Sequence, residues 1–244
     1  MADRSRNVIY QTTTNLETYE VVEEVYADRY SRLLYSGQVK TAQSGIPLDN
    51  SDLMLFEYCQ RLVELVMDLQ PKDVLMIGGG AFTLPTHLIK TNKNIQFDVI
   101  EPDKDLEVIA KQYFELEVSK QINVINDFGL HYLKNSKKKY DLIILDAYYE
   151  DSIPKEFLSR KFAKLAVSSL KEHGVLAANV VSTLRMDAKV LEMHNIYRKY
   201  FKYSRLYPTT KDRTYYYAHN IIYVASLEPE NFLLKYPALR QLEA

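Results

Sequence analysis

Short apolar runs alternate with longer stretches in which apolar residues recur at helical spacing. The runs have the length and branched side chains of buried strands, and we predict strands over 74–77, 97–100, 122–127, 141–146 and 174–179. The longer stretches predict helices over 83–92, 105–116, 161–170 and 188–201, with a short helix ending near 135. Gly174 is expected to end the helix before the fifth strand. Since strand alternates with helix, the expected fold class is α/β, with a doubly wound, mostly parallel sheet.

The first 50 residues do not follow this alternation. Residues 8–42 combine short extended runs with turns, and Ser36-Gly37 has the composition of a hairpin turn, so we predict a small antiparallel β-subdomain. Residues 43–47 are predicted to form a loop, and residues 50–52 to cap a helix over roughly 53–69. At the other end, the runs 203–207 and 220–226 predict a closing antiparallel pair. The expected organisation is therefore an N-terminal β-subdomain over 1–50 and a Rossmann-like domain over 51–244.

The charge balance is even, with 31 Lys and Arg residues against 32 Asp and Glu residues and a net charge of -1. This balance does not favour nucleic acid or a membrane surface as a partner. Cys59 is the single cysteine, so the chain contains no disulfide framework or cysteine metal site. The five histidines are scattered without ligand spacing, and no metal is expected. The sequence has no 18-residue apolar span and a polar N-terminus, which predicts a cytoplasmic protein.

A glycine-rich turn follows the first of these strands. Gly78, Gly79 and Gly80 carry no side chains, so a ligand can approach backbone N–H groups and the N-terminus of the next helix. Glu101 ends the next strand about 20 residues later, where a nucleotide-binding βαβ unit places a carboxylate that accepts from ribose hydroxyls. The pattern predicts a nucleoside site. A tight strand-to-helix turn followed by a solvated acid is the alternative.

Two further acids stand at strand ends, and the carboxyl ends of neighbouring strands converge on one crevice. Asp127 can accept from an exocyclic adenine amine while Phe128 packs near the ring. Asp146 opens a loop, 146–154, that mixes carboxylates with tyrosine hydroxyls. Such a loop suits a cationic ligand, because acids neutralise an ammonium group and aromatic faces attract it. An ordinary solvated loop is the alternative.

Five motifs resemble the spermidine/spermine synthase (polyamine aminopropyltransferase) family, and the resemblance extends over roughly 8–226. They are Val74-Leu-Met-Ile-Gly-Gly-Gly80, Val99-Ile-Glu-Pro-Asp103, Asn126-Asp-Phe-Gly129, Tyr140-Asp-Leu-Ile-Ile-Leu-Asp146 with Pro154, and Leu170-Lys-Glu-His-Gly-Val-Leu176. The resemblance implies a Rossmann-like fold of the class I S-adenosylmethionine-dependent transferase type, preceded by a β-subdomain. It also implies aminopropyl transfer from decarboxylated S-adenosylmethionine to a polyamine, in a homodimer. By motif, Glu101 binds ribose, Asp127 binds adenine and Gln43 lies near the donor tail.

The sequence departs from the family pattern at two places. The family's turn reads Gly-Gly-Gly-Asp-Gly-Gly, and its Asp holds the donor's ammonium group, whereas this chain has Ala81 there. The family's catalytic loop reads Asp-x-x-Asp-Pro-x-Gly-Pro, but Tyr149 stands three residues after Asp146. If Pro154 matches the second proline, the loop is one residue longer, and Glu150 or Asp151 supplies the missing carboxylate. The chain is thus expected to be a divergent member.

The predicted reaction is alkylation of an amine by an S-adenosylmethionine-type donor. A carboxylate must hold the protonated amine and take its proton as the nitrogen attacks. Glu150 and Asp151 are the candidates, with Asp146 and Tyr149 assisting and Tyr148 and Tyr149 orienting the acceptor. Methyl transfer from S-adenosylmethionine is the first alternative, because Ala81 removes an acid that would repel that donor's carboxylate. A non-catalytic nucleoside-binding protein is the second.

Overall fold

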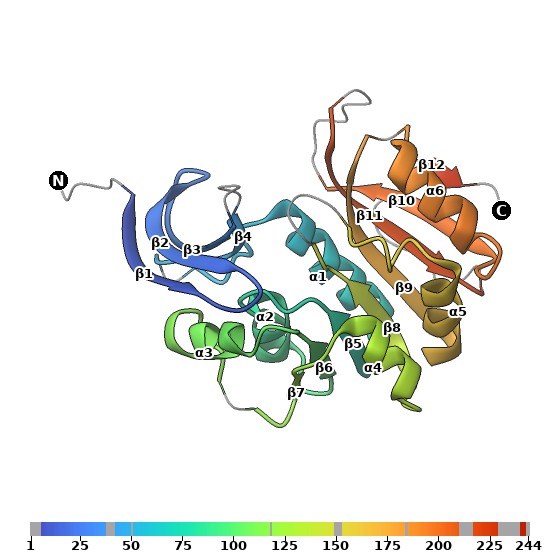
Figure 1. Cartoon of the computed structure of the whole chain (residues 1–244), viewed down its shortest axis with the longest axis horizontal. Coiled ribbons are helices and arrows are strands. Elements are labelled where there is room, and N and C mark those ends of the chain that lie inside the picture. Colours follow the sequence, from blue (N-terminus) through green and yellow to red (C-terminus); the bar gives the residue numbers. More distant parts are fainter. Residues whose placement is uncertain are drawn as a thin grey trace.

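The structure is a computed structural model that describes residues 6–37, 42–49, 51–117, 119–148, 153–183, 185–209, 217–228 and 240–242 of the 244-residue chain. These residues form two sheets. A larger sheet lies between two layers of helices, and a smaller N-terminal sheet lies beside it at one end of the long axis (Figure 1). The predicted α/β class with a mostly parallel sheet and an additional antiparallel N-terminal sheet is confirmed.

The N-terminal sheet is antiparallel and its strands follow one another in sequence order. They are β1 (Asn7–Thr13), β2 (Thr18–Tyr26), β3 (Arg29–Ser36) and β4 (Ala42–Pro47). The prediction of a loop over 43–47 is wrong, because these residues pair with β3. Gly45 permits this pairing: a Cβ atom there would lie 2.6 Å from the side chain of Leu33. The boundary predicted at residue 50 stays a prediction.

The larger sheet has the order β12-β10-β11-β9-β8-β5-β6-β7. Its strands are β5 (Asp73–Ile77), β6 (Gln96–Ile100), β7 (Ile122–Ile125), β8 (Tyr140–Leu145), β9 (Leu170–Ser182), β10 (Tyr203–Pro208), β11 (His219–Ser226) and β12 (Arg240–Leu242). The five strands from β9 to β7 are parallel, and β11, β10 and β12 pair antiparallel. The strand order reverses between β5 and β8, and ligands bind outside such a switch point.

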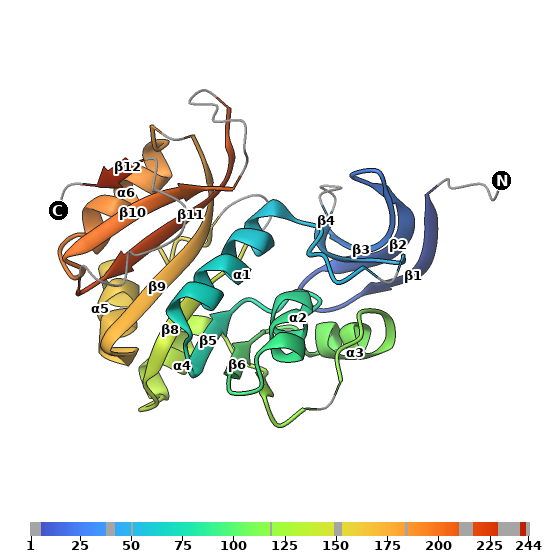
Figure 2. The same ribbon diagram turned by 180° about the vertical axis from the view of Figure 1, so that it is seen from behind.

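Helices cover both faces of the larger sheet. They are α1 (Glu57–Leu69), α2 (Thr83–Thr91), α3 (Lys104–Tyr113), α4 (Gly129–Asn135), α5 (Arg160–Ser169) and α6 (Ala188–Tyr197). Figure 1 shows α4, α5 and α6 on one face, and Figure 2 shows α1 and α2 on the other. No helix in the described ranges is long and apolar enough to cross a membrane.

Alternate residues of the central strands supply the two cores. Val74 and Met76 of β5 pack with α1, α2 and α3, whereas Leu75 and Ile77 pack with α4, α5 and α6. The N-terminal sheet contributes to the first of these cores through four buried side chains, Tyr19, Val21, Leu33 and Leu34. The small sheet is therefore fixed to the larger one by shared apolar burial.

The predicted boundaries are wrong at α1 and α6, and so is the residue predicted to end α5. Helix α1 begins at Glu57 rather than near 53, and its N-cap, Phe56, makes no side-chain cap. Leu53, the first residue of the predicted helix, lies outside α1 and is 52% exposed. Helix α5 passes directly into β9 at Leu170, so Gly174 does not end it. Gly174 lies inside β9, where a Cβ atom would come within 3.0 Å of a backbone carbonyl of β8. Helix α6 ends at Tyr197 instead of 201.

The buried carboxylate of Asp98 forms hydrogen bonds with side chains of β7, of β8 and of the segment before β8. Asp98 of β6 accepts hydrogen bonds from the hydroxyl of Tyr140 at 2.7 Å, from Lys138 Nζ at 2.8 Å and from Asn123 Nδ2 at 2.9 Å. Burial raises the pKa of this carboxyl, but these hydrogen bonds outweigh burial and hold the pKa below its ordinary value. The ionised form therefore stabilises the fold.

Asp98→Asn is expected to lower the free energy of unfolding by about 2–3 kcal/mol at pH 7, because it breaks charge-assisted bonds at a buried site. The stabilisation by Asp98 is complete above the pKa of an aspartate in the unfolded chain, about 3.9. Because the pKa is lower in the folded protein, this stabilisation is lost as the pH falls from that value through the folded-state pKa. Urea denaturation at several pH values measures it. Glu107→Gln, which breaks an exposed pair with Lys111, is the control and is expected to cost less than about 1 kcal/mol.

The turn after β5 brings two backbones into contact. Gly78 has a φ of +94°, and a Cβ atom there would lie 2.2 Å from the backbone oxygen of Asp146. Gly37 also has a positive φ, +68°, but its Cβ atom would meet only the flexible carboxylate of Glu17, at 3.2 Å. The two glycines share the same backbone constraint and differ in what surrounds them.

Gly37→Ala is expected to cost about 1–2 kcal/mol of unfolding free energy, the penalty for a Cβ atom in a left-handed conformation. Gly78→Ala should cost a further 1–3 kcal/mol or so, because the backbone of Asp146 cannot move aside as a side chain can. Thermal and urea unfolding of both variants measure the difference. Equal losses would contradict the close backbone contact.

Candidate active site

Glu101 lies directly beneath the glycine turn. Its Oε2 accepts from the backbone N–H of Gly79 at 2.9 Å and its Oε1 accepts from that of Asp103 at 3.0 Å. Burial raises the pKa of this carboxyl, and the backbone hydrogen bonds oppose the rise. Each oxygen has a further lone pair, so this carboxylate can accept from a pair of adjacent hydroxyls while it holds the turn.

Strand β4 reaches the other side of the same turn. The hydroxyl of Ser44 accepts from the backbone N–H of Ala81 at 3.0 Å. Gln43, predicted to lie near a donor tail, precedes Ser44 and donates through its side chain to Ser36. Ala81 itself is fully buried. The N-terminal sheet therefore supports the turn through Ser44, a residue that the sequence analysis did not select.

The N-terminal sheet also contacts the residues that follow Glu101. Thr14 donates to Asp103 Oδ2 at 2.5 Å, and Asp103 Oδ1 caps α3 by accepting from the backbone N–H of Asp105. Tyr19 is buried beside Asp103; burial and the nearby charges of Asp103 and Glu101 raise its pKa. A nucleoside bound at Glu101 would thus lie at the junction of the two sheets.

Asp127 stands at the end of the adjacent strand, β7, as predicted. Asn126 donates to the backbone oxygens of Glu101 and Pro102, at 3.0 and 2.8 Å, and so holds this loop beside Glu101. The carboxylate of Asp127 contacts His131 Nδ1 at 2.8 Å. Phe128 is 57% exposed, so its ring is available to a planar ligand.

Asp146 follows β8, on the opposite side of the glycine turn from Glu101. Its Oδ1 accepts from Asn179 Nδ2 at 2.9 Å. Burial raises the pKa of this carboxyl, and hydrogen bonds from Asn179 and Tyr58 counteract the rise. Within the described part of the chain, no Lys, Arg or His forms an ion pair with it. Its hydrogen-bond donors are neutral, so its negative charge is uncompensated.

The loop after Asp146 is described only in part. Tyr148 donates through its hydroxyl to the backbone oxygen of Asn179 at 2.9 Å, and burial together with the charge of Asp146 raises its pKa. Tyr148 therefore lies beside Asn179 and Asp146 at the carboxyl edge of the sheet, and its predicted contact with the acceptor stays a prediction. Tyr149, Glu150 and Asp151 lie outside the described residues, and their roles stay predictions.

Three residues around Asp146 were not selected from the sequence. Tyr58 comes from α1, Asn179 from β9 and Asn220 from β11. Asn179 could have been found by the rule that identified the acids, because it also ends an apolar run at the carboxyl edge of the sheet. Asn220 could not, since its position depends on how β11 pairs with β9.

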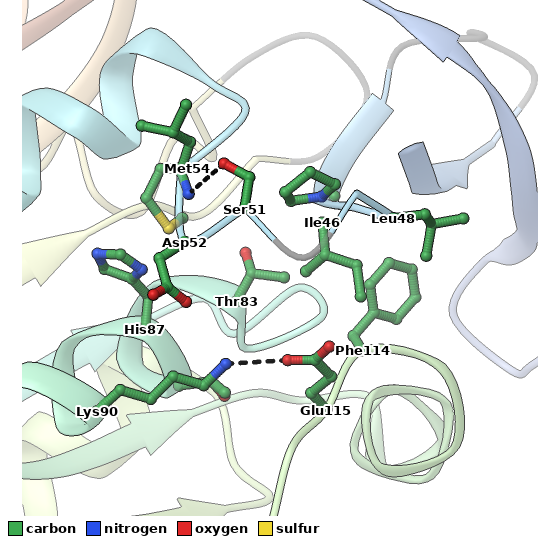
Figure 3. A pocket seen from close by; sticks show the side chains of 14 residues that line it. Ile46, Leu48, Ser51, Asp52, Met54, Thr83, His87, Lys90, Phe114 and Glu115 are labelled. Atoms are coloured by element: carbon green, nitrogen blue, oxygen red, sulfur yellow. Dashed lines mark hydrogen bonds and ion pairs between the residues drawn. The ribbon is translucent and has the colours of Figure 1, made fainter. Parts of the chain in front are cut away.

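A cavity of about 290 Å³ lies elsewhere, between β4, the segment 51–54, one face of α2 and the residues after α3 (Figure 3). One ion pair and one acid–histidine contact lie in its lining. Lys90 pairs with Glu115 at 3.0 Å, and Asp52 lies beside His87, whose pKa is lowered mainly by burial. No predicted site residue lines this cavity. The carboxyl edge of the sheet between Glu101 and Asp146, where the predicted residues meet, is therefore the candidate active site.

Comparison with known proteins identifies relatives of this chain. It is 27% identical over 171 residues to a polyamine aminopropyltransferase of Vibrio vulnificus, an alignment that covers 68% of the chain and 56% of the relative. Alignments with the first curated relatives span 45% to 64% of their own lengths. The chain thus matches less than two thirds of these proteins.

Two solved structures have the same fold. A spermidine synthase in complex with the transition-state analogue AdoDATO superposes with a TM-score of 0.73 at 18% identity, covering 92% of this chain and 75% of that one. A probable spermidine synthase from Corynebacterium glutamicum gives a TM-score of 0.75 at 18% identity, with coverage of 90% and 80%. The spermine/spermidine synthase domain model matches residues 55–235. Since this match spans most of the chain, the protein belongs to the spermine/spermidine synthase family.

Proposed function

We propose that this protein is a transferase that alkylates an amine, moving an aminopropyl group from decarboxylated S-adenosylmethionine to a polyamine acceptor. Asp146 carries the proposal: a carboxylate with neutral hydrogen-bond donors and no protein cation in the described residues is suited to an ammonium ligand. The family membership and the polyamine aminopropyltransferase relatives support the same reaction.

The residues around the glycine turn fit the nucleoside part of such a donor. Glu101 offers two oxygens to the ribose hydroxyls, and Asp127 with Phe128 offers a carboxylate and an exposed ring to adenine. The missing side chains of Gly78, Gly79 and Gly80 let the turn pack closely on the protein around it, since Cβ atoms there would lie 2.2 Å from Asp146, 2.8 Å from Phe82 and 2.7 Å from Ser44. The donor supplies a carbon already activated by a sulfonium leaving group.

The acceptor amine would meet Asp146 on the other side of the turn. The carboxylate first binds the ammonium form and then accepts one proton, which frees the nitrogen lone pair. A nitrogen–carbon bond then forms as the carbon–sulfur bond breaks, and the sulfur leaves as a neutral thioether. Burial, which raises the pKa of Asp146, makes it a stronger base than an exposed aspartate. Glu150 and Asp151 remain candidates for a second ammonium contact.

Methyl transfer from S-adenosylmethionine is the competing reaction, because Ala81 replaces the acid that the family uses to hold the donor's ammonium group. Incubation with each donor and a panel of amines, followed by mass spectrometry of the products, distinguishes the two. The homodimer and the cytoplasmic location stay predictions from the resemblance and the sequence.

Glu101→Gln is expected to raise the dissociation constant for methylthioadenosine at least about tenfold, because an amide replaces a carboxylate that accepts from two hydroxyls. Titration calorimetry measures the affinity, and circular dichroism checks the fold. Glu115→Gln, the same substitution at an exposed pair, is expected to leave the affinity unchanged. If both variants bind like the wild type, Glu101 does not contact the nucleoside.

Asp146→Asn is expected to lower the single-turnover rate about 10²–10⁴-fold at saturating donor, since the amide cannot accept the proton. Methylthioadenosine affinity should be retained. Asp141→Asn is the matched control, because Asp141 lies at the other end of β8 and bonds Lys171 instead.

Glu150→Gln and Asp151→Asn, tested alongside, show whether the loop contributes a second acid. A wild-type rate in Asp146→Asn, together with a loss in either loop variant, would move the base into the loop.

A further inference from the structure

We propose that Asn179 and Asn220 are positioning residues for Asp146, two amides in series that fix the direction of its carboxylate toward the acceptor amine. The inference rests on the proposed function, since it assigns a task to the carboxylate that the proposal makes the base. Asn179 lies on β9, Asn220 lies on β11, and Asp146 directly follows β8; these three strands are neighbours in the larger sheet.

The register of these strands puts the three side chains in one row. Ala178 of β9 is the partner of Leu145, so Asn179 lies beside Asp146 at the carboxyl edge. In the antiparallel pair, Asn179 is the partner of Ile222, and Asn220 lies two residues along β11 on the same face. Asn220 Nδ2 donates to Asn179 Oδ1 at 3.0 Å, and Asn179 Nδ2 donates to Asp146 Oδ1 at 2.9 Å.

The second amide holds the first one in the orientation that Asp146 requires. An asparagine amide can turn by 180° and exchange its oxygen with its nitrogen. An ionised carboxylate can only accept, so Asn179 must turn its NH₂ group to Asp146 and its oxygen to Asn220, whose own NH₂ group holds that oxygen in place. The opposite orientation would set an amide oxygen against a carboxylate oxygen, two acceptors without a proton between them. Thr209 in turn donates to the backbone oxygen of Asn220 at 2.6 Å.

Neutral donors suit a base in this position better than a cation would. A Lys or Arg beside Asp146 would neutralise the charge that an ammonium ligand needs, and would make the carboxylate a weaker base. An amide orients the same oxygen and leaves the charge available. Asn179 is 3% exposed, so water cannot readily replace the hydrogen bond if its side chain is removed.

The other groups that face Asp146 are neutral where it titrates. Tyr58 and Cys59 approach from α1, and burial raises the pKa of both. Tyr148 follows in its own loop, where the charges of Asp146 and Asp187 also raise its pKa. Removing Asn179 should therefore change the titration of Asp146 without a competing change in a neighbour.

Asn179→Ala is expected to shift the acid limb of the pH–rate profile by about one pH unit to higher pH, because the ionised carboxylate loses a donor. The rate at neutral pH should fall about tenfold. Asn220→Ala should shift the limb in the same direction by less, since it only frees the Asn179 amide to turn. Asn123→Ala is the control. It removes a 2.9 Å amide–carboxylate hydrogen bond to Asp98, away from Asp146, and should not move the acid limb of the pH–rate profile.

A second readout does not depend on turnover. The carboxyl ¹³C signal of Asp146, followed by NMR against pH, should titrate at higher pH in Asn179→Ala than in the wild type and in Asn123→Ala. An unchanged midpoint in both Asn179→Ala and Asn220→Ala would overturn the inference even in an active enzyme. A shifted midpoint in a protein that alkylates no amine would support it and refute the proposed function. If Asn179→Ala does not fold, Asn220→Ala carries the test.

Discussion

The contact between Gly78 and the backbone of Asp146 is the constraint on which the site depends. Two parallel strands, β5 and β8, diverge at this point because the chain order of the sheet reverses there. The missing side chain at position 78 lets the turn after β5 lie against the first residue after β8. One turn therefore separates Glu101 from Asp146, so a nucleoside bound at Glu101, as proposed, would have Asp146 on the other side of the same turn.

Asp146 differs from the other acids discussed above in the groups that surround it. Asp98 is buried with a lysine, and the acids of the cavity beside α2 have basic neighbours. Asp146 is held by an amide and a hydroxyl instead. Asp146 is half-buried, and a carboxylate partly removed from water without a cationic partner lowers stability, so a bound cation would stabilise this part of the fold.

The parts of the structure that local pattern encodes were predictable from the sequence. The strand ending in three glycines and the acids at strand ends depend on residues adjacent in the chain. Strand β4 was missed because Gly45 and Pro47 are typical of loops, and only the packing of Gly45 on β3 explains their place in a strand. Asn220 was missed for a different reason: its contact with Asn179 joins two residues 41 apart in sequence, which meet only because β11 pairs with β9.

The hydrogen bonds from Thr14 and Tyr19 to Asp103 connect the N-terminal sheet to the residues beside Glu101. Asp103 donates its backbone N–H to Glu101, so the carboxylate that faces the nucleoside and the residue that anchors the sheet belong to one network. By thermodynamic linkage, whatever free energy the docked sheet adds to nucleoside binding, the bound nucleoside returns to the docking of the sheet. If the proposed nucleoside site is correct, the docking of the smaller sheet and the binding of the nucleoside would stabilise each other within a single chain.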